Sequence, residues 1–152
     1  MTTKNFNVKN GLTAGNITLD AATGNLTSTN ANITTNLTAN TISSSRLNIR
    51  TSTTASTSTL TPDISAYDQY NITAQAAPLT IAAPIGTPVD GNKLMIRLLD
   101  NGTARALTWN ATYTVIGCIL PLSTTINKMT YVGCIYNATN SRWDVIAVTT
   151  QS

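Results

Sequence analysis

The residue types that usually carry catalysis are scarce in this sequence of 152 residues. It contains no histidine and no glutamate, so all six acidic residues are aspartates. Ser-His-Asp and Cys-His arrangements, the usual zinc ligand sets and the glutamate pairs of most glycosidases are therefore excluded. No G-x-S-x-G nucleophile motif is present. The sequence predicts a protein that is not an enzyme.

Aspartates are the remaining candidates for chemistry. Five of them lie in the C-terminal part of the chain: Asp63, Asp68, Asp90, Asp100 and Asp144. Glycoside hydrolysis would need two of these carboxylates within about 10 Å of each other in a cleft. The clusters at 90–92 and 100–102 lack the spacing and the terminal glutamate of an EF-hand, so we interpret them as turns. No metal and no cofactor is expected.

Two cysteines, Cys118 and Cys134, lie in the matching contexts Ile-Gly-Cys-Ile and Val-Gly-Cys-Ile, which are typical of strands. The N-terminus has no apolar stretch like that of a signal peptide. The sequence contains no run of 18 apolar residues, so no membrane span is predicted. A reduced pair of small core side chains is the favoured interpretation. Contact between adjacent strands or a late disulfide is the alternative.

The composition favours β-structure and contact with other subunits. The chain holds 30 threonines and 17 asparagines, which favour strands and turns over helix interiors. Only 10% of the residues are charged, against about a quarter in typical proteins. Such a surface suits permanent packing against other chains, because few charges have to be desolvated at an interface.

The positive charge is confined to the N-terminal part. Residues 1–60 hold Lys4, Lys9, Arg46 and Arg50 against Asp20, whereas residues 61–152 hold five basic and five acidic residues. The four cations are dispersed, and Phe6 is the only aromatic residue near them that could stack on a base. Nucleic-acid binding is therefore not expected.

Residues 1–60 form a segment that cannot fold alone. Its aliphatic residues recur singly in a polar background. Ordering each residue costs roughly 1–2 kcal/mol, while one buried aliphatic side chain returns only about 1.5–3 kcal/mol. We predict an extended, β-rich arm that becomes ordered by docking on a partner or by winding around identical chains. Its interface residues would be Phe6, Val8, Leu12, Ile17, Leu19, Leu26, Ile33, Leu37, Ile42, Leu47 and Ile49.

Residues 61–152 have the pattern of a compact β-domain, preceded by a Ser/Thr-rich linker over 51–61. Short apolar or β-branched runs of strand length, separated by turn residues, occur at 78–81, 93–99, 105–109, 112–116, 129–136 and 143–148. Hairpins are predicted around 100–102 and 137–141. The spacing predicts an antiparallel β-sandwich or jelly roll.

Aromatic residues of this domain allow two interpretations. Trp109, Trp143, Tyr131 and Tyr136 fit packing in the core or at its rim. The alternative is a set of surface-binding aromatics made of Trp109, Tyr113 and Trp143, which would contact a ligand.

Two stretches carry a resemblance to known proteins. The opening Lys4-Asn5-Phe6-Asn7-Val8-Lys9-Asn10-Gly11-Leu12-Thr13, with Gly15-Asn16-Ile17 and Ala22-Thr23-Gly24-Asn25-Leu26, resembles the N-terminal segments of tailed-phage fibre and structural proteins, notably of cyanophages. The stretches 79–81, 84–110, 131–137 and 143–145 resemble a β-domain of phage virion proteins. This second resemblance is the more specific, because it runs through several turns in order.

The resemblance implies a non-enzymatic, homotrimeric component of the virion, assembled in the bacterial host cytoplasm. We favour a capsid decoration (cement) protein that docks on the major capsid protein by its N-terminal arm. The alternative is a short tail or receptor-binding fibre, bound to a tail component and contacting a glycan of the host surface. The expected partners are thus further copies of the chain and another virion protein, with no membrane.

Overall fold

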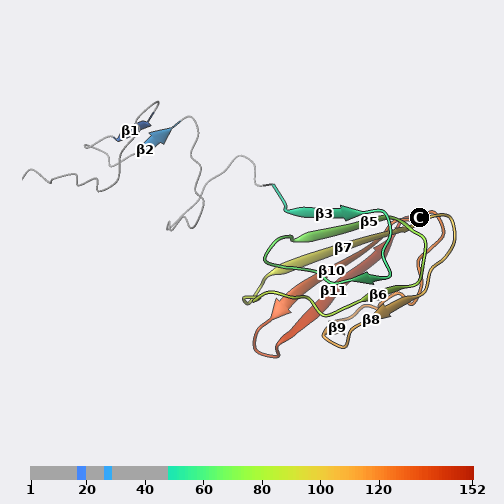
Figure 1. The fold of residues 1–152 in the computed structure, drawn as a ribbon. Coiled ribbons are helices and arrows are strands. Elements are labelled where there is room, and N and C mark those ends of the chain that lie inside the picture. Colours follow the sequence, from blue (N-terminus) through green and yellow to red (C-terminus); the bar gives the residue numbers. More distant parts are fainter. Residues whose placement is uncertain (1–16, 20–25, 29–47) are drawn as a thin grey trace, which may run out of the picture. The chain divides into compact units, whose positions relative to one another are not determined.

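The computed structural model describes residues 17–19, 26–28 and 48–152 (Figure 1). The chain divides into two compact units, Met1–Ser45 and Arg46–Ser152. In the first unit, β1 (Ile17–Leu19) and β2 (Leu26–Ser28) form an antiparallel pair. Three predicted arm residues thus lie on strands: Ile17, Leu19 and Leu26. The arm residues that lie outside the described part are Phe6, Val8, Leu12, Ile33, Leu37, Ile42 and Leu47.

The described part of the second unit is built from strands and contains no helix, as the composition predicts. Its first six strands alternate between two sheets as the chain proceeds. One sheet receives β3 (Thr51–Thr54), β5 (Gln69–Gln75) and β7 (Lys93–Asp100). The other receives β4 (Thr59–Leu60), β6 (Leu79–Ile81) and β8 (Leu107–Trp109). The chain therefore winds in coils, each adding one strand to each sheet.

The winding makes these strands parallel. In both series each strand pairs with the one two places later in the chain, and every pairing is parallel. Two parallel neighbouring strands need a long crossover connection, which usually contains a helix. Here each crossover connection contains a strand of the opposite sheet instead. The predicted antiparallel arrangement is therefore wrong for this half of the unit. The hairpin predicted around 100–102 is also absent, because β7 and β8 belong to different sheets.

The C-terminal strands complete the larger sheet. β10 (Thr130–Asn137) and β11 (Arg142–Thr150) form the antiparallel hairpin predicted around 137–141. β10 also pairs with β7, and β9 (Tyr113–Val115) adds to β11 as a parallel edge strand. The six-stranded sheet has the order β3-β5-β7-β10-β11-β9, and the three-stranded sheet has the order β4-β6-β8. Both sheets are visible in Figure 1.

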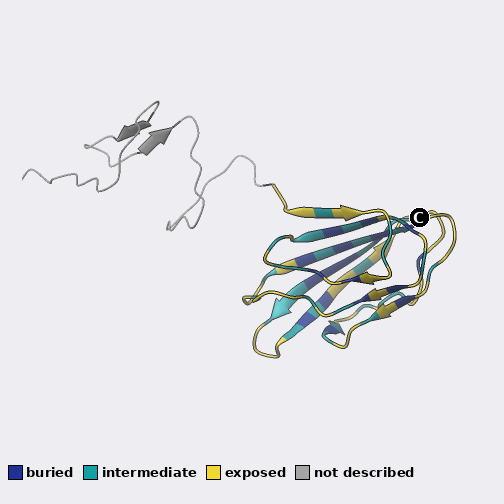
Figure 2. Cartoon of the chain, viewed as in Figure 1, coloured by how far each residue is buried: buried dark blue, intermediate teal, exposed yellow. Residues whose placement is uncertain are grey.

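The core is formed by alternate residues of both sheets (Figure 2). Along β7 the residues Leu94, Ile96 and Leu98 are fully buried, while the residues between them are more exposed. This period-2 pattern gives the six-stranded sheet a core face and an opposite face, which we call the outer face. The core cluster comprises Leu60, Tyr70, Ile72, Leu79, Ile81, Leu94, Ile96, Leu98, Leu107, Tyr113, Val132, Cys134, Trp143 and Val145.

The predicted linker over 51–61 belongs to the second unit instead. Its strands β3 and β4 are edge strands, held by backbone hydrogen bonds such as Ala74 N–H to the Ala55 carbonyl at 2.8 Å. Leu60, the one large aliphatic residue of the stretch, is buried in the core. An edge strand held mainly by its backbone needs few apolar side chains, which is why a Ser/Thr run suffices. The second unit thus begins before the predicted domain boundary at residue 60.

Candidate functional site

The chain enters the second unit through a dense contact at Arg50. The Arg50 side chain donates to both carboxylate oxygens of Asp68, at 2.9 Å from Nε and 2.7 Å from Nη2. It also donates to the carbonyl oxygens of Ser65 (2.6 Å) and Ile64 (3.2 Å). The Arg50 carbonyl accepts the amides of Asp68 and Gln69. Arg50 therefore fixes the start of β3 to the loop before β5.

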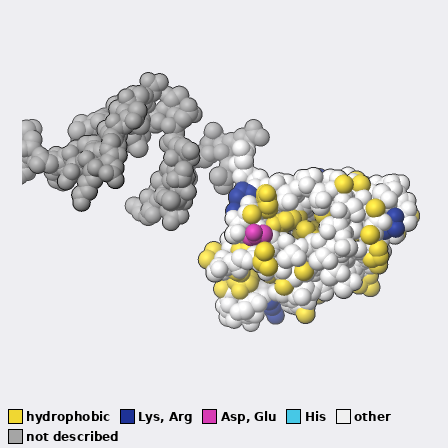
Figure 3. All heavy atoms as spheres, viewed as in Figure 1, with side chains coloured by type: hydrophobic (Ala, Val, Ile, Leu, Met, Phe, Trp, Pro, Cys, Tyr) yellow, Lys and Arg dark blue, Asp and Glu magenta, His cyan; other side chains and the backbone are white. Residues whose placement is uncertain are grey.

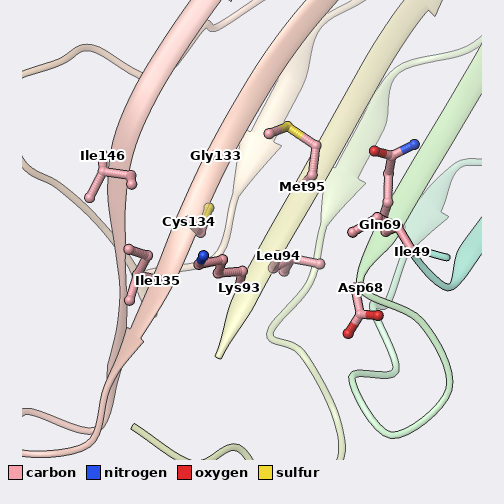
Figure 4. Close-up of a pocket in the computed structure, with 10 residues that line it drawn as sticks. All are labelled: Ile49, Asp68, Gln69, Lys93, Leu94, Met95, Gly133, Cys134, Ile135 and Ile146. Atoms are coloured by element: carbon pink, nitrogen blue, oxygen red, sulfur yellow. The ribbon is translucent and has the colours of Figure 1, made fainter. Parts of the chain in front are cut away.

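A groove of about 270 Å³ lies on the outer face beside this entry point (Figure 4). Ile49, the last residue before Arg50, lies at its rim and is 63% exposed. The other lining residues come from the loop before β5 and from four adjacent strands: Asp68, Gln69, Lys93, Leu94, Met95, Gly133, Cys134, Ile135 and Ile146. Of these, only Ile49 was predicted as an interface residue. We call this feature the outer groove.

Two local features of the β10–β11 pair shape the outer groove. Gly133 has no side chain, and a Cβ placed there would meet Met95 Cε at 3.6 Å and Ala147 Cβ at 3.7 Å. The pairing shifts at Gly133, so that Ile146 is an extra residue opposite β10. Bulges of this kind redirect side chains, and Ile146 is half exposed at the groove. A glycine inside a strand pattern was the sequence signal for this place.

A second candidate surface is the loop over residues 116–126, which we call the aliphatic loop. It is held to β11 by Cys118, whose thiol lies 3.2 Å from the Val145 carbonyl, and to β8 by the Leu107 amide, which donates to the Leu122 carbonyl. Leu120 packs against the core, whereas Ile119 and Leu122 face solvent and are 85% and 80% exposed. No charged residue occurs between Asn110 and Asn127.

The three predicted surface aromatics lie mostly in the core. Trp143 and Tyr113 are 2% and 5% exposed, and the Tyr113 hydroxyl donates to the Ala82 carbonyl at 3.1 Å. Trp109 is half-buried, packs edge-on against Tyr113, and donates its indole N–H to the Pro121 carbonyl at 2.8 Å. The surface-binding assignment is therefore corrected for Tyr113 and Trp143, because buried rings cannot stack on a ligand. The core interpretation of Trp143 is confirmed.

The aspartates are arranged as structural acceptors. Hydrogen bonds from Ser65 lower the pKa of Asp63, and those from Arg50 lower the pKa of Asp68. Burial alone would raise the pKa of Asp100, but the amides of Asn127 and Gly102 hold it below its usual value. A glycosidase general acid needs a raised pKa, and none of these three carboxyl groups has one. Among the described residues no group of three potential metal ligands lies together.

Both cysteines are free thiols. Cys134 is buried on β10, and burial raises its pKa to about 12. Cys118 is half-buried and lies beyond the end of β9, so its predicted place on a strand is corrected. The chain turns there because Gly117 has a φ of 70°, a left-handed conformation that glycine adopts readily.

The free energy of unfolding should fall when the pH drops below the ordinary range of aspartate. The hydrogen bonds from Arg50 lower the pKa of Asp68, and those from Asn137 and then Arg142 lower the pKa of Asp144. The pKa values of these aspartates are lower in the folded protein than in the unfolded chain. Their contribution to stability is therefore complete at a pH above the pKa values of the unfolded chain, and it is lost as the pH falls through the pKa values of the folded protein. Urea unfolding from about pH 6 to pH 2 measures the effect.

Substitution Asp68→Asn should make this acid dependence shallower. Lys128→Gln also changes the net charge by one but touches no carboxylate, so it should keep the dependence of the intact chain. If the free energy of unfolding falls equally steeply with decreasing pH in the two variants, Asp68 does not contribute to the acid dependence.

No family model, curated protein or solved structure matches the chain. The resemblance of its segments to virion proteins therefore remains a prediction from the sequence. Among the described residues, no helix is long and apolar enough to cross a membrane. The surface features that the described residues offer are the outer groove, the aliphatic loop and, on the face drawn in Figure 3, few charged side chains.

Proposed function

We propose that the protein is a non-enzymatic structural component of a bacteriophage virion, and that it acts as a homotrimeric capsid decoration protein. In this proposal the N-terminal segment docks on the shell as an extended arm, and the β-body of residues 48–152 covers neighbouring shell subunits. Binding only to the assembled shell would stabilise the particle by mass action. The trimer and the virion location come from the sequence resemblance, and the exposed aliphatic side chains of residues 48–152 support contact with another protein chain.

The aliphatic loop is the observation that carries the proposal. Exposed Ile119 and Leu122 lie on a loop that hydrogen bonds fix to two strands, so their exposure is not the result of a loose chain end. Ordered aliphatic side chains in a charge-free stretch are typical of surfaces that another protein covers. We assign the aliphatic loop to contact between copies of the chain.

The trimer is tested by native mass spectrometry of the full chain. We expect a trimer for the intact protein and a shift toward monomer for Ile119→Asp combined with Leu122→Asp, because two carboxylates would be desolvated at each contact. Val89→Asp changes another aliphatic residue, 63% exposed and outside the aliphatic loop, and should leave the trimer intact. A monomeric intact chain would contradict the proposal.

The number of copies per virion separates decoration from the fibre alternative. Hundreds of copies are expected for a decoration protein, and particles lacking it should burst at lower temperature. A few to a few tens of copies, with normal shell stability and lost host adsorption, would favour a fibre. Burial of Tyr113 and Trp143 removes two of the three aromatic residues on which glycan contact was predicted.

A further inference from the structure

Two charged residues of β7 lie on either side of the outer groove. Lys93, Met95 and Arg97 project from the outer face, since Leu94 and Ile96 between them are buried in the core. Residues two apart on a strand are separated by about 6.6 Å, so Lys93 and Arg97 lie about 13 Å apart along it. Met95 and its sheet neighbour Gly133 lie between the two cations and form the apolar centre.

The two acidic residues on this side of the sheet are already neutralised. Asp68 is held through both oxygens by Arg50. Asp144, which pairs with Ile135 across β10 and β11, accepts from Arg142 at 2.7 Å and from the Asn137 amide at 2.9 Å.

Lys93 and Arg97, by contrast, form no ion pair within the described part of the chain. Arg97 lies over the ring of Tyr131, with 5.2 Å between the guanidinium carbon and the ring centroid. Its Nε is buried without a hydrogen-bond partner among the described residues. Arg97 as a whole is partly exposed, so its terminal Nη groups, and not the buried Nε, are the in-plane donors that can meet an incoming carboxylate. The outer face therefore presents two uncompensated cations around an apolar hollow.

We propose that the outer groove docks an extended acidic segment of a different protein. An aliphatic side chain of that segment would lie over Gly133, and acidic residues two positions before and two positions after it would pair with Lys93 and Arg97. This spacing follows from the period of an extended chain, whose alternate side chains point to one side. The proposal rests on the proposed function only for the partner's identity, a neighbouring virion protein.

The chain itself does not supply this pattern. Its six aspartates are at positions 20, 63, 68, 90, 100 and 144, and no two of them are four residues apart. A second copy therefore cannot place both carboxylates from one extended segment. A glycan fits less well, because aliphatic side chains line the groove and Arg97 covers the ring of Tyr131.

The test is titration of the full chain with a seven-residue synthetic peptide. The peptide has leucine at its centre, aspartate two residues to each side and threonine elsewhere; its twin has asparagine in place of aspartate. NMR shifts of Met95 and Gly133 report the site. We expect the aspartate peptide to bind at least fivefold more tightly than its twin, with an affinity that falls as salt is added.

Variants of the groove residues, with one control variant, test where the peptide binds. Lys93→Glu with Arg97→Glu should weaken the aspartate peptide about tenfold or more, since each exposed pair is worth roughly two- to fivefold and reversal adds repulsion. Gly133→Val should weaken both peptides by filling the hollow. If it lowers the melting temperature, Gly133→Ala replaces it, because its Cβ would meet only ordinary contacts. Lys128→Glu reverses a cation outside the groove and should have no effect.

Several results would overturn the proposal. They are equal affinity of the two peptides, no shifts at Met95 and Gly133 at millimolar peptide, and unchanged binding by the charge-reversed variant. Tighter, competing binding of polygalacturonate would assign the groove to an acidic polysaccharide instead. The titration uses no particle, so its failure leaves capsid decoration standing. Conversely, a failed trimer or copy-number experiment leaves the groove assignment standing.

Discussion

Replacing Gln75 by leucine should destabilise the second unit by about 3 kcal/mol, because three part-buried backbone groups would lose their partner. The Gln75 side chain is fully buried between the first two coils. Its oxygen accepts the Thr57 amide at 3.1 Å, and its nitrogen donates to the carbonyl oxygens of Thr57 and Ala77 at 2.6 and 2.7 Å. Leucine has a similar size but satisfies none of these groups. Urea unfolding followed by tryptophan fluorescence measures the change.

A matched control is available on the same strand. Gln69 lies at the other end of β5, and its amide donates to the Asn71 side chain rather than to backbone groups. Gln69→Leu should therefore change the free energy of unfolding by no more than about 0.5 kcal/mol. Similar losses for the two variants would mean that the buried amide does not hold the coils together.

The position of an N-terminal truncation should decide whether the body folds. A chain beginning at Asn48 keeps all the strands of the body, and we expect it to unfold cooperatively near the melting temperature of the full chain. A chain beginning at Thr61 lacks β3, β4 and the buried side chain of Leu60, and leaves the Gln75 amide without Thr57. We expect it to lose about 5 kcal/mol, comparable to the whole stability of a small domain.

Near-ultraviolet circular dichroism and thermal melts of the two truncated chains test this expectation. The shorter chain should lose the near-ultraviolet signal of its packed tryptophans and melt without a cooperative transition. If it melts as the longer chain does, the Ser/Thr-rich stretch acts as the linker that its composition predicts. A chain from Asn48 that fails to fold would instead show that the body depends on residues 1–47.

The positions of strands were more predictable than their partners. Each of the six runs predicted between residues 78 and 148 overlaps a strand, because alternating apolar side chains report local burial. Strand β5 was missed although Tyr70 and Ile72 alternate with polar residues, since Ala74 and the buried Gln75 end the apolar pattern. Strands β3 and β4 were missed because backbone hydrogen bonds to their neighbours leave little trace in side-chain types.

The parallel pairing was not predictable from strand spacing. Short strands separated by turns usually pair with the next strand in the chain. Here the turn after β5 sends the chain to the other sheet, and Gln75 fixes that corner by bonding to Ala77 and Thr57. A buried glutamine is only one more polar residue in a sequence rich in them. The contact between Gln75 and Thr57 joins residues 18 positions apart, and the sequence pattern gives no sign of it.

The candidate surfaces were predictable only in part. The low charge content indicated interfaces, and Ile49 was named among the interface residues, but the outer groove was not expected. It depends on Gly133 lying beside Met95 from another strand, a neighbourhood set by sheet register. The aromatic residues predicted the binding surface less well, because large rings such as that of Trp143 are buried in the core of a small β-domain.

The contact at Arg50 determines how the body would respond to mechanical load. Tension carried along residues 1–47 reaches the body at Ile49 and meets Arg50 before it reaches β3. The guanidinium there holds Asp68, Ser65 and Ile64 together, and the Arg50 carbonyl holds two further amides. Because these bonds lie between Ile49 and β3, we expect a pulled chain to load them before it loads the edge strand β3, which has a partner on one side only.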